Sequence, residues 1–259
     1  MRKEQNNKKD TSWQKVKSWY ISEVGEKGHF YHQNVVIPGA LKLLNLKQGI
    51  SVLDLGCGSG VLGRYLDENI YYEGFDNSPD LIKFAQKQDS NKNHFYKVSD
   101  VTKELSTAKT DFDRAACILA LQNFENFNQA ISLASQHLKD GSIFVIVLNH
   151  PCFRIPRQSS WEVDEKQNIQ YRRIAKYMSE MKIPISANPS RGKSSQVTWS
   201  FHFSLSKLSE ELKANGFLIE KIDEWISSKK SKGGEAKREN ISRQEIPLFM
   251  AIKAVKITL

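Results

Sequence analysis

Three aspartates have spacing that suits ligand binding, because each stands at the end of a segment that predicts a buried β-strand. They are Asp54, Asp76 and Asp100. The carboxyl ends of successive parallel strands meet at one crevice of a doubly wound sheet, so we expect these side chains to lie close together. Carboxylates gathered in one crevice attract positive charge and accept hydrogen bonds from hydroxyl and amino groups.

A glycine-rich segment follows the first of these aspartates, in the sequence Asp-Leu-Gly-Cys-Gly-Ser-Gly. Gly56, Gly58 and Gly60 permit a tight turn and let a ligand approach the backbone closely. The stretch from Gly58 onward also matches the dinucleotide pattern GxGxxG. A dinucleotide would place its pyrophosphate near Asp54, which would repel it, whereas the ammonium and sulfonium groups of S-adenosylmethionine would be attracted. Asp76 could then accept both ribose hydroxyls of that ligand.

The segments DLGCGSG, GFDNSP and KVSDV resemble motifs I, II and III of the class I S-adenosylmethionine-dependent methyltransferases, in the family's order and spacing. The resemblance covers about residues 30–150. It implies an α/β fold with a doubly wound, mostly parallel sheet of seven strands in the order 3-2-1-4-5-7-6, the last strand antiparallel. It also implies S-adenosyl-L-methionine as cofactor and S-adenosyl-L-homocysteine as product.

The resemblance assigns a part of the cofactor to each motif. Asp54 and the backbone of the three glycines would hold the methionine part, Asp76 with Asn77 the ribose, and Asp100 the adenine amine. The other cofactor-binding residues that it implies are Ser99 and Val101 beside the adenine, Leu119, Ala120 and Asn123 at the end of the fourth strand, and Tyr31 and His32 in an N-terminal lid. Simple helix packing is the alternative for Tyr31 and His32. The alternative for each aspartate is a helix cap or a turn residue.

Alternating strand and helix patterns predict the elements that position these residues. The expected strands are 51–55, 71–75, 94–98, 111–119, 143–148, 217–226 and 246–256, and the expected helices are 62–68, 79–88, 128–138 and 205–215. Two further helices are expected within 13–46. The polar stretch 227–240 predicts a loop.

The elements divide the chain into four segments. We expect a tail and helical lid over 1–46, a cofactor-binding core over 47–150, an insertion that covers the substrate and one edge of the sheet over 151–203, and the rest of the core sheet over 204–259. No apolar run approaches the ~20 residues that span a bilayer. Three scattered cysteines without CxxC spacing indicate neither disulfides nor a zinc site and suit a cytoplasmic protein.

Methyl transfer from a sulfonium is an in-line displacement, so the protein has to align donor and acceptor and exclude water. A base is needed only where the acceptor loses a proton. His150, after the fifth strand, is the first candidate for that base, and His202 is the second. A structural histidine is the alternative for both. Cys152 follows Pro151 as in cytosine methyltransferases, but after the wrong strand, so an ordinary turn cysteine is favoured.

The insertion supplies candidate acceptor-binding residues. Arg154 and Arg157 could bind a carboxylate or phosphate, or they could pair with Glu162 or Asp164. Trp161 could form an apolar wall of the acceptor site, or it could simply pack the insertion.

Several functions remain open from the sequence. The segment from Asn149 to Trp161 resembles small-molecule enzymes similar to the ubiquinone and menaquinone biosynthesis methyltransferases, which favours a small-molecule acceptor. The net charge of +9 and the basic stretch 229–243 keep an RNA methyltransferase as an alternative. A non-catalytic module that binds S-adenosylmethionine is a further alternative. An NAD-linked oxidoreductase is disfavoured by the repulsion at Asp54.

Overall fold

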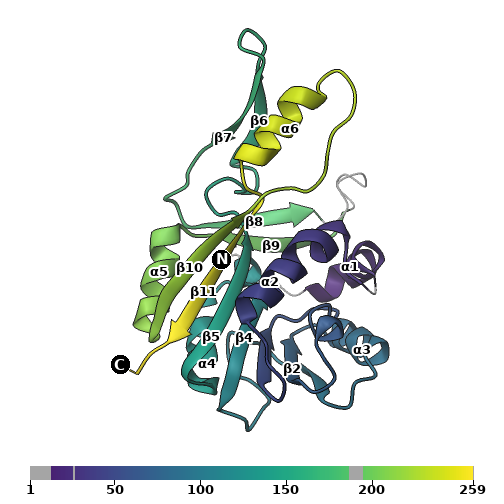
Figure 1. Ribbon diagram of the computed structural model, residues 1–259, viewed down its shortest axis with the longest axis vertical. Coiled ribbons are helices and arrows are strands. Elements are labelled where there is room, and N and C mark those ends of the chain that lie inside the picture. Colours follow the sequence, from purple (N-terminus) through teal and green to yellow (C-terminus); the bar gives the residue numbers. More distant parts are fainter. Residues whose placement is uncertain (1–12, 26, 187–194, 259) are drawn as a thin grey trace, which may run out of the picture.

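The structure is a computed structural model that describes residues 13–25, 27–186 and 195–258. Its centre is a seven-stranded sheet in the order β10-β11-β5-β4-β1-β2-β3 (Figure 1). The strands are β1 (Ser51–Leu55), β2 (Tyr71–Asp76), β3 (His94–Val98), β4 (Phe112–Ile118), β5 (Leu138–Asn149), β10 (Phe217–Trp225) and β11 (Phe249–Lys256). Strand β11 runs antiparallel to both neighbours, while β1 to β5 pair in parallel. The expected sheet is therefore confirmed.

Helices cover both faces of this sheet. One face is covered by α2 (Ile37–Leu44) and α3 (Pro79–Gln88), and the other by α4 (Phe127–His137) and α5 (Leu205–Ala214). The buried positions follow the helical period, as with Leu208 and Leu212 of α5. The Ser204 hydroxyl caps α5 by accepting a hydrogen bond from the backbone N–H of Lys207. The N-terminal segment adds the turns η1 (Trp13–Val16) and η2 (His32–Val36) and the helix α1 (Lys17–Val24).

The helix expected over 62–68 is wrong, because only a 3-10 turn, η3 (Gly63–Tyr65), forms there. Glycines at positions 58, 60 and 63 weaken any helix at this point. Gly63 also lies directly against the ring of Tyr96, and Leu66 is already extended. The chain therefore turns toward β2 after a single turn.

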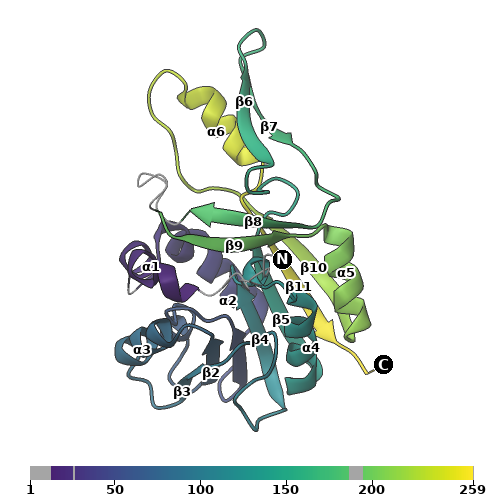
Figure 2. The ribbon, with the colours of Figure 1, turned by 180° about the vertical axis from the view of Figure 1, so that it is seen from behind.

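The insertion forms two antiparallel hairpins. The strands β8 (Met181–Ser186) and β9 (Val197–His202) cross the carboxyl ends of the sheet strands, and β9 contacts both η1 and η4 (Leu121–Asn123) (Figure 2). The strands β6 (Ser159–Asp164) and β7 (Ile169–Ile174) project farther from the sheet, together with α6 (Ala236–Glu245).

Helix α6 also corrects the expectation of a loop over 227–240, since it begins within that stretch. Its sequence is too polar to show a buried face. The helix is held by tertiary contacts instead, because Ser242 donates to Gln170 of β7 and Arg238 pairs with Glu165. No helix in the described part of the chain is long and apolar enough to cross a membrane.

Candidate functional site

The glycine loop leaves the carboxyl end of β1 in a conformation that favours glycine. Gly56, Gly58 and Gly60 have φ angles of +78°, +55° and +75°. The N–H groups of Gly56 and Cys57 both donate to the carbonyl of Phe75, at 2.8 and 2.9 Å, which ties the loop to β2. A Cβ on Gly60 would lie 2.8 Å from that of Ala85 in α3. The loop is therefore fixed by both backbone angle and packing.

Asp54 is buried beside this loop with one oxygen left free. Its Oδ2 accepts a hydrogen bond of 2.7 Å from the Tyr72 hydroxyl, whereas Oδ1 has no hydrogen-bond partner. Burial raises the pKa of Asp54 to about 7, the Tyr72 hydrogen bond acts in the opposite direction, and the charge of Asp76 raises the pKa further. A buried carboxylate oxygen without a partner costs stability, and a cationic ligand would remove that cost.

Asp76 joins the end of β2 to the glycine loop. Its Oδ2 accepts from the N–H of Gly58 at 3.1 Å and its Oδ1 from the N–H of Ser78 at 2.9 Å. Burial raises the pKa of Asp76 to about 6, although both hydrogen bonds lower it. Each carboxylate oxygen keeps a further acceptor site, so the group can still receive two hydroxyls. Asn77 beside it is exposed.

Asp100 lies at the end of β3 but is engaged in a local turn. Its Oδ1 accepts from the N–H and the hydroxyl of Thr102, and its Oδ2 pairs with Lys103 at 2.7 Å. Burial alone would raise the pKa of Asp100, but the bonds from Lys103 and Thr102 hold it below its usual range. The N–H of Ser99 donates to the carbonyl of Asp76 at 3.0 Å, and Val101 is buried in the core. The turn role considered from the sequence is therefore present here.

The end of β4 closes over the glycine loop. Leu119 has a φ of +54°, which is uncommon for a residue with a side chain, and its N–H donates to Val147 at 2.8 Å. Ala120 is buried against Gly56, where an added Cβ would lie 2.6 Å from that of Ala120. The Asn123 amide donates to the carbonyl of Leu119 at 3.2 Å.

The N-terminal segment covers the same site. The Tyr20 ring of α1 packs over Gly58, and His32 of η2 is buried with its Nδ1 unpartnered. Burial and the neighbouring His29 lower the pKa of His32 to about 3, so its ring is neutral. Tyr31 packs edge-to-face on Phe249 and its hydroxyl lies 3.0 Å from that of Ser227.

A pocket of about 320 Å³, part of it open to solvent, lies beside the glycine loop. Of the cofactor-binding residues expected from the sequence, Asp54, Gly56 and His32 line it, whereas Asp76 and Asp100 do not. Its walls also include residues that the sequence analysis missed, namely Tyr20, Ile37, Cys57, Val61, Leu62 and Ile118. Tyr20 was visible only as one of several apolar residues at helical spacing, and nothing in the sequence places it over Gly58.

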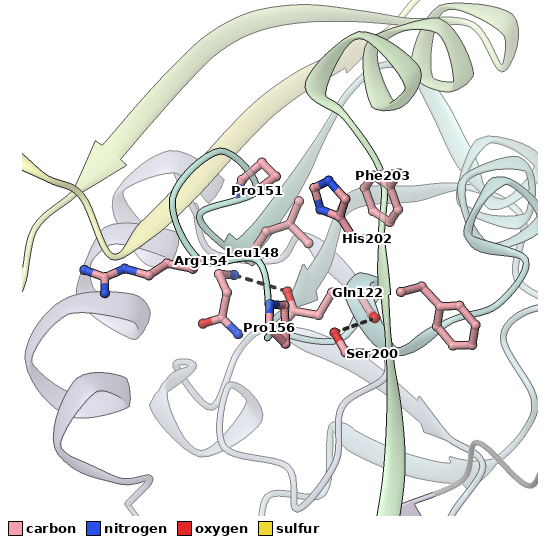
Figure 3. Close-up of a pocket in the computed structure, with 10 residues that line it drawn as sticks. Gln122, Leu148, Pro151, Arg154, Pro156, Ser200, His202 and Phe203 are labelled. Carbon is pink, nitrogen blue, oxygen red and sulfur yellow. Dashed lines mark hydrogen bonds between the residues drawn. The ribbon is translucent and has the colours of Figure 1, made fainter. Parts of the chain in front are cut away.

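A second cavity, of about 360 Å³, lies beneath β9, between Gln122, Leu148 and the segment from Pro151 to Pro156 (Figure 3). His202 lines this cavity. Its Nε2 lies 2.7 Å from the carbonyl of Tyr177, which can only accept, so Nε2 carries the proton and Nδ1 is the acceptor of the neutral ring. Burial lowers the pKa of His202 more than this hydrogen bond raises it.

His150 has both ring nitrogens engaged. Its Nδ1 accepts from the N–H of Cys152 at 3.2 Å, and its Nε2 donates to Glu224 at 2.7 Å. Burial lowers the pKa of His150, against the effect of Glu224. These bonds favour the structural alternative for His150 and leave His202 as the better base candidate.

Comparison with known proteins agrees with this geometry. The family model described as a methyltransferase domain matches residues 46–204. The chain belongs to this methyltransferase family. None of the curated proteins matches it.

Solved structures share the methyltransferase fold at low sequence identity. An S-adenosylmethionine-dependent methyltransferase from Mesorhizobium loti is 24% identical, with a TM-score of 0.67 over 85% of this chain and 96% of that one. A putative S-adenosylmethionine-dependent methyltransferase from Listeria monocytogenes is 21% identical, with a TM-score of 0.67 over 85% and 99%. A chain in the complex between the Haloferax volcanii Trm112 methyltransferase activator and the putative methyltransferase is 16% identical, with a TM-score of 0.66 over 96% and 99%. The class I methyltransferase fold expected from the motifs is thereby confirmed.

Two arginines of the methyltransferase's insertion, Arg154 and Arg157, lie in different surroundings. Arg154 lies 5.2 Å from the Trp161 ring and its Nε donates to the carbonyl of Pro247, and its guanidinium points away from the second cavity (Figure 3). Arg157 is exposed. Glu162, considered as a partner for these arginines, pairs with Arg173 instead. In the part of the methyltransferase that the structure describes, no group of three His, Cys, Asp or Glu side chains is placed to hold a metal ion.

Proposed function

We propose that this methyltransferase transfers the methyl group of S-adenosyl-L-methionine to a small-molecule acceptor by in-line displacement, releasing S-adenosyl-L-homocysteine. The observation that carries this proposal is the unpartnered Oδ1 of Asp54 in a cavity at the tip of β1. A buried carboxylate suits the ammonium and sulfonium groups of this cofactor, which favour its charged form, and it repels a diphosphate. The residues present therefore fit the cofactor.

The cofactor residues take the roles that the motifs imply. Asp54 and the backbone of Gly56, Gly58 and Gly60 would hold the methionine part, Asp76 with Asn77 the ribose, and Asp100 with Ser99 and Val101 the adenine. Leu119, Ala120 and Asn123 would border the methyl group, and Tyr31 and His32 would exclude water from above. When bound, the cofactor supplies an electrophilic methyl group. The chain then needs mainly to orient the acceptor and keep water out.

His202 is the residue we propose as base for an acceptor that loses a proton. Its protonated Nε2 is held by the carbonyl of Tyr177, so the basic Nδ1 is presented in a fixed ring orientation. The neutral state of the ring is favoured by burial. We propose no catalytic role for His150, whose nitrogens are both occupied.

Charge pairing on the projecting hairpin and α6 supports a small acceptor over RNA. Arg173 pairs with Glu162, Arg238 with Glu165, and Arg243 with Glu239. An RNA-binding surface needs cations that are free to neutralise phosphates. Two of the six cations in the basic stretch 229–243, Arg238 and Arg243, are therefore compensated by acids.

Calorimetry with the full chain tests the cofactor assignment. We expect S-adenosylmethionine and S-adenosylhomocysteine to bind and to raise the melting temperature, and we expect NAD to do neither. Bulk tRNA at low salt is the comparison for the acceptor class. Binding of NAD without binding of the sulfonium compound would overturn the cofactor proposal, and tight, salt-dependent tRNA binding would overturn the small-molecule acceptor.

A further inference from the structure

Three cations lie near aromatic rings, two at Trp161 and one at Tyr31, and Arg154 interacts electrostatically with both Arg172 and Tyr31. The guanidinium carbons of Arg154 and Arg172 each lie 5.2 Å from the ring centre of Trp161. The Lys229 ammonium lies 5.1 Å from the ring centre of Tyr31. We call these five residues the cation cluster. It joins the insertion, the N-terminal segment and the chain after β10.

None of the three cations forms an ion pair within the described residues. A cation next to them in the chain does pair with an acid. Arg173, next to Arg172 in the chain, pairs with Glu162 at 3.0 Å. Arg172 instead donates to neutral oxygens, those of the Phe153 carbonyl and the Ser159 hydroxyl. The positive charge of the cluster is therefore uncompensated, unlike that of its surroundings.

Partial burial of the two arginines strengthens their attraction for an anion. Arg154 and Arg172 are half-buried, and burial, followed by repulsion from Arg172, lowers the pKa of Arg154 to about 10. Like charges held together in a partly dry site attract an anion more strongly than the same charges in water. Trp161 packs against both guanidiniums and so holds them in place before any ligand arrives, which reduces the ordering cost of binding.

The cluster adjoins the cofactor cavity through Tyr31. The next residue, His32, lines that cavity. Tyr31 also packs on Phe249, which pairs in the sheet with Asn149 at the end of β5. A molecule held by the cluster would thus lie at the same end of the sheet as the cofactor, next to the N-terminal cover.

We propose that the cation cluster binds an anionic group, a carboxylate or a phosphate, of the methyl acceptor. This inference rests on the proposed methyltransferase function and specifies its substrate class. Guanidinium groups bind two oxygens of a carboxylate or of a phosphate through paired hydrogen bonds. Two half-buried arginines and one exposed lysine provide a site for one such group at the end of a small molecule.

A titration with simple probes tests the site separately from catalysis. The full chain, saturated with S-adenosylhomocysteine, is titrated by calorimetry with phenyl phosphate, benzoate and neutral phenol. We expect at least one anion to bind and phenol to bind at least tenfold more weakly. The preferred anion distinguishes a phosphate-bearing from a carboxylate-bearing acceptor.

Matched variants locate the binding. Arg172→Met and Lys229→Met should each weaken the anion about tenfold, the scale for one charge-assisted contact. Arg173→Met and Lys230→Met, the neighbouring positions, should leave it unchanged. Affinity for S-adenosylhomocysteine, measured for every variant, shows that the core remains folded.

The outcomes separate the two proposals. If S-adenosylhomocysteine binds but neither anion binds, or if Arg173→Met weakens the anion as much as Arg172→Met, the cation cluster is not the site and the proposed function stands. If S-adenosylhomocysteine itself fails to bind, the proposed function fails first. Anion binding abolished by tRNA, together with tight tRNA binding, would replace the small acceptor by an RNA backbone.

Discussion

The hydroxyl of Tyr72 donates a hydrogen bond of 2.7 Å to Oδ2 of Asp54, and both side chains are buried. This bond satisfies one carboxylate oxygen and leaves the other without a partner. The arrangement fixes the orientation of the carboxylate, while burial still disfavours its ionised form. The site is thus built for a cation at some cost to the stability of the free protein.

Asp54→Asn should stabilise the free protein at pH 8 and weaken cofactor binding. Burial raises the pKa of Asp54 in the folded state to about 7, above its ordinary value of 3.8, so the folded state holds a proton that the unfolded state lacks between these values. Stability from this group is therefore present below about pH 3.8 and is lost as the pH rises through 7. Asparagine keeps the Tyr72 hydrogen bond without the charge.

Thermal melts at pH 5 and pH 8 check this expectation. The melting temperature of Asp54→Asn should exceed that of the parent by several degrees at pH 8 and by less at pH 5. The exposed acid Asp111, changed to Asn, serves as the control and should show no such gain. A lower melting temperature for Asp54→Asn at pH 8, or unchanged affinity for S-adenosylmethionine, would refute this account of Asp54.

Asp76→Ala should reduce cofactor affinity by roughly 1–3 kcal/mol, because the ribose hydroxyls would lose their acceptor. The substitution also removes the acceptor of the Gly58 N–H, which loosens the glycine loop. Calorimetric affinity for S-adenosylhomocysteine is the measurement. Unchanged affinity would show that the ribose is held elsewhere.

The sequence was sufficient for features set by local patterns. The bounds of α3 and β3 agree with those expected, because proline at a helix start and the spacing of apolar and aromatic residues act within a few residues. The positions of the three aspartates at strand ends could be predicted, because each stands at or directly after an apolar strand segment in the sequence. The order of the seven strands came from the family resemblance.

Features that depend on distant partners could not be predicted. Tyr20 covers Gly58, and Glu224 accepts a hydrogen bond from His150, although the two residues are 74 positions apart in the sequence. The proposal of His202 and not His150 as the base rests on that contact. Likewise α6 is held by bonds to β7, so its own polar sequence indicates only a loop.

Gly60→Ala should destabilise the fold far more than Gly141→Ala, although both glycines have similar positive φ angles, +75° and +76°. An added Cβ at Gly60 would collide with Ala85 and Tyr96, whereas nothing lies within 4 Å at Gly141. We expect a loss of roughly 2–5 kcal/mol at Gly60 and about 1–2 kcal/mol at Gly141. Urea unfolding measures both, and equal losses would show that packing at Gly60 is unimportant.

His150→Ala should lower the free energy of unfolding by roughly 1–3 kcal/mol while leaving affinity for S-adenosylhomocysteine unchanged. The substitution leaves the N–H of Cys152 without its acceptor and removes the partner of the Glu224 carboxylate, which is exposed and can be hydrated instead. Glu224→Gln retains an acceptor for Nε2 and should cost clearly less. Urea unfolding and calorimetry measure the two quantities. An alanine variant as stable as the parent would show that these hydrogen bonds do not hold the end of β5, and His150 would again be a candidate for the base.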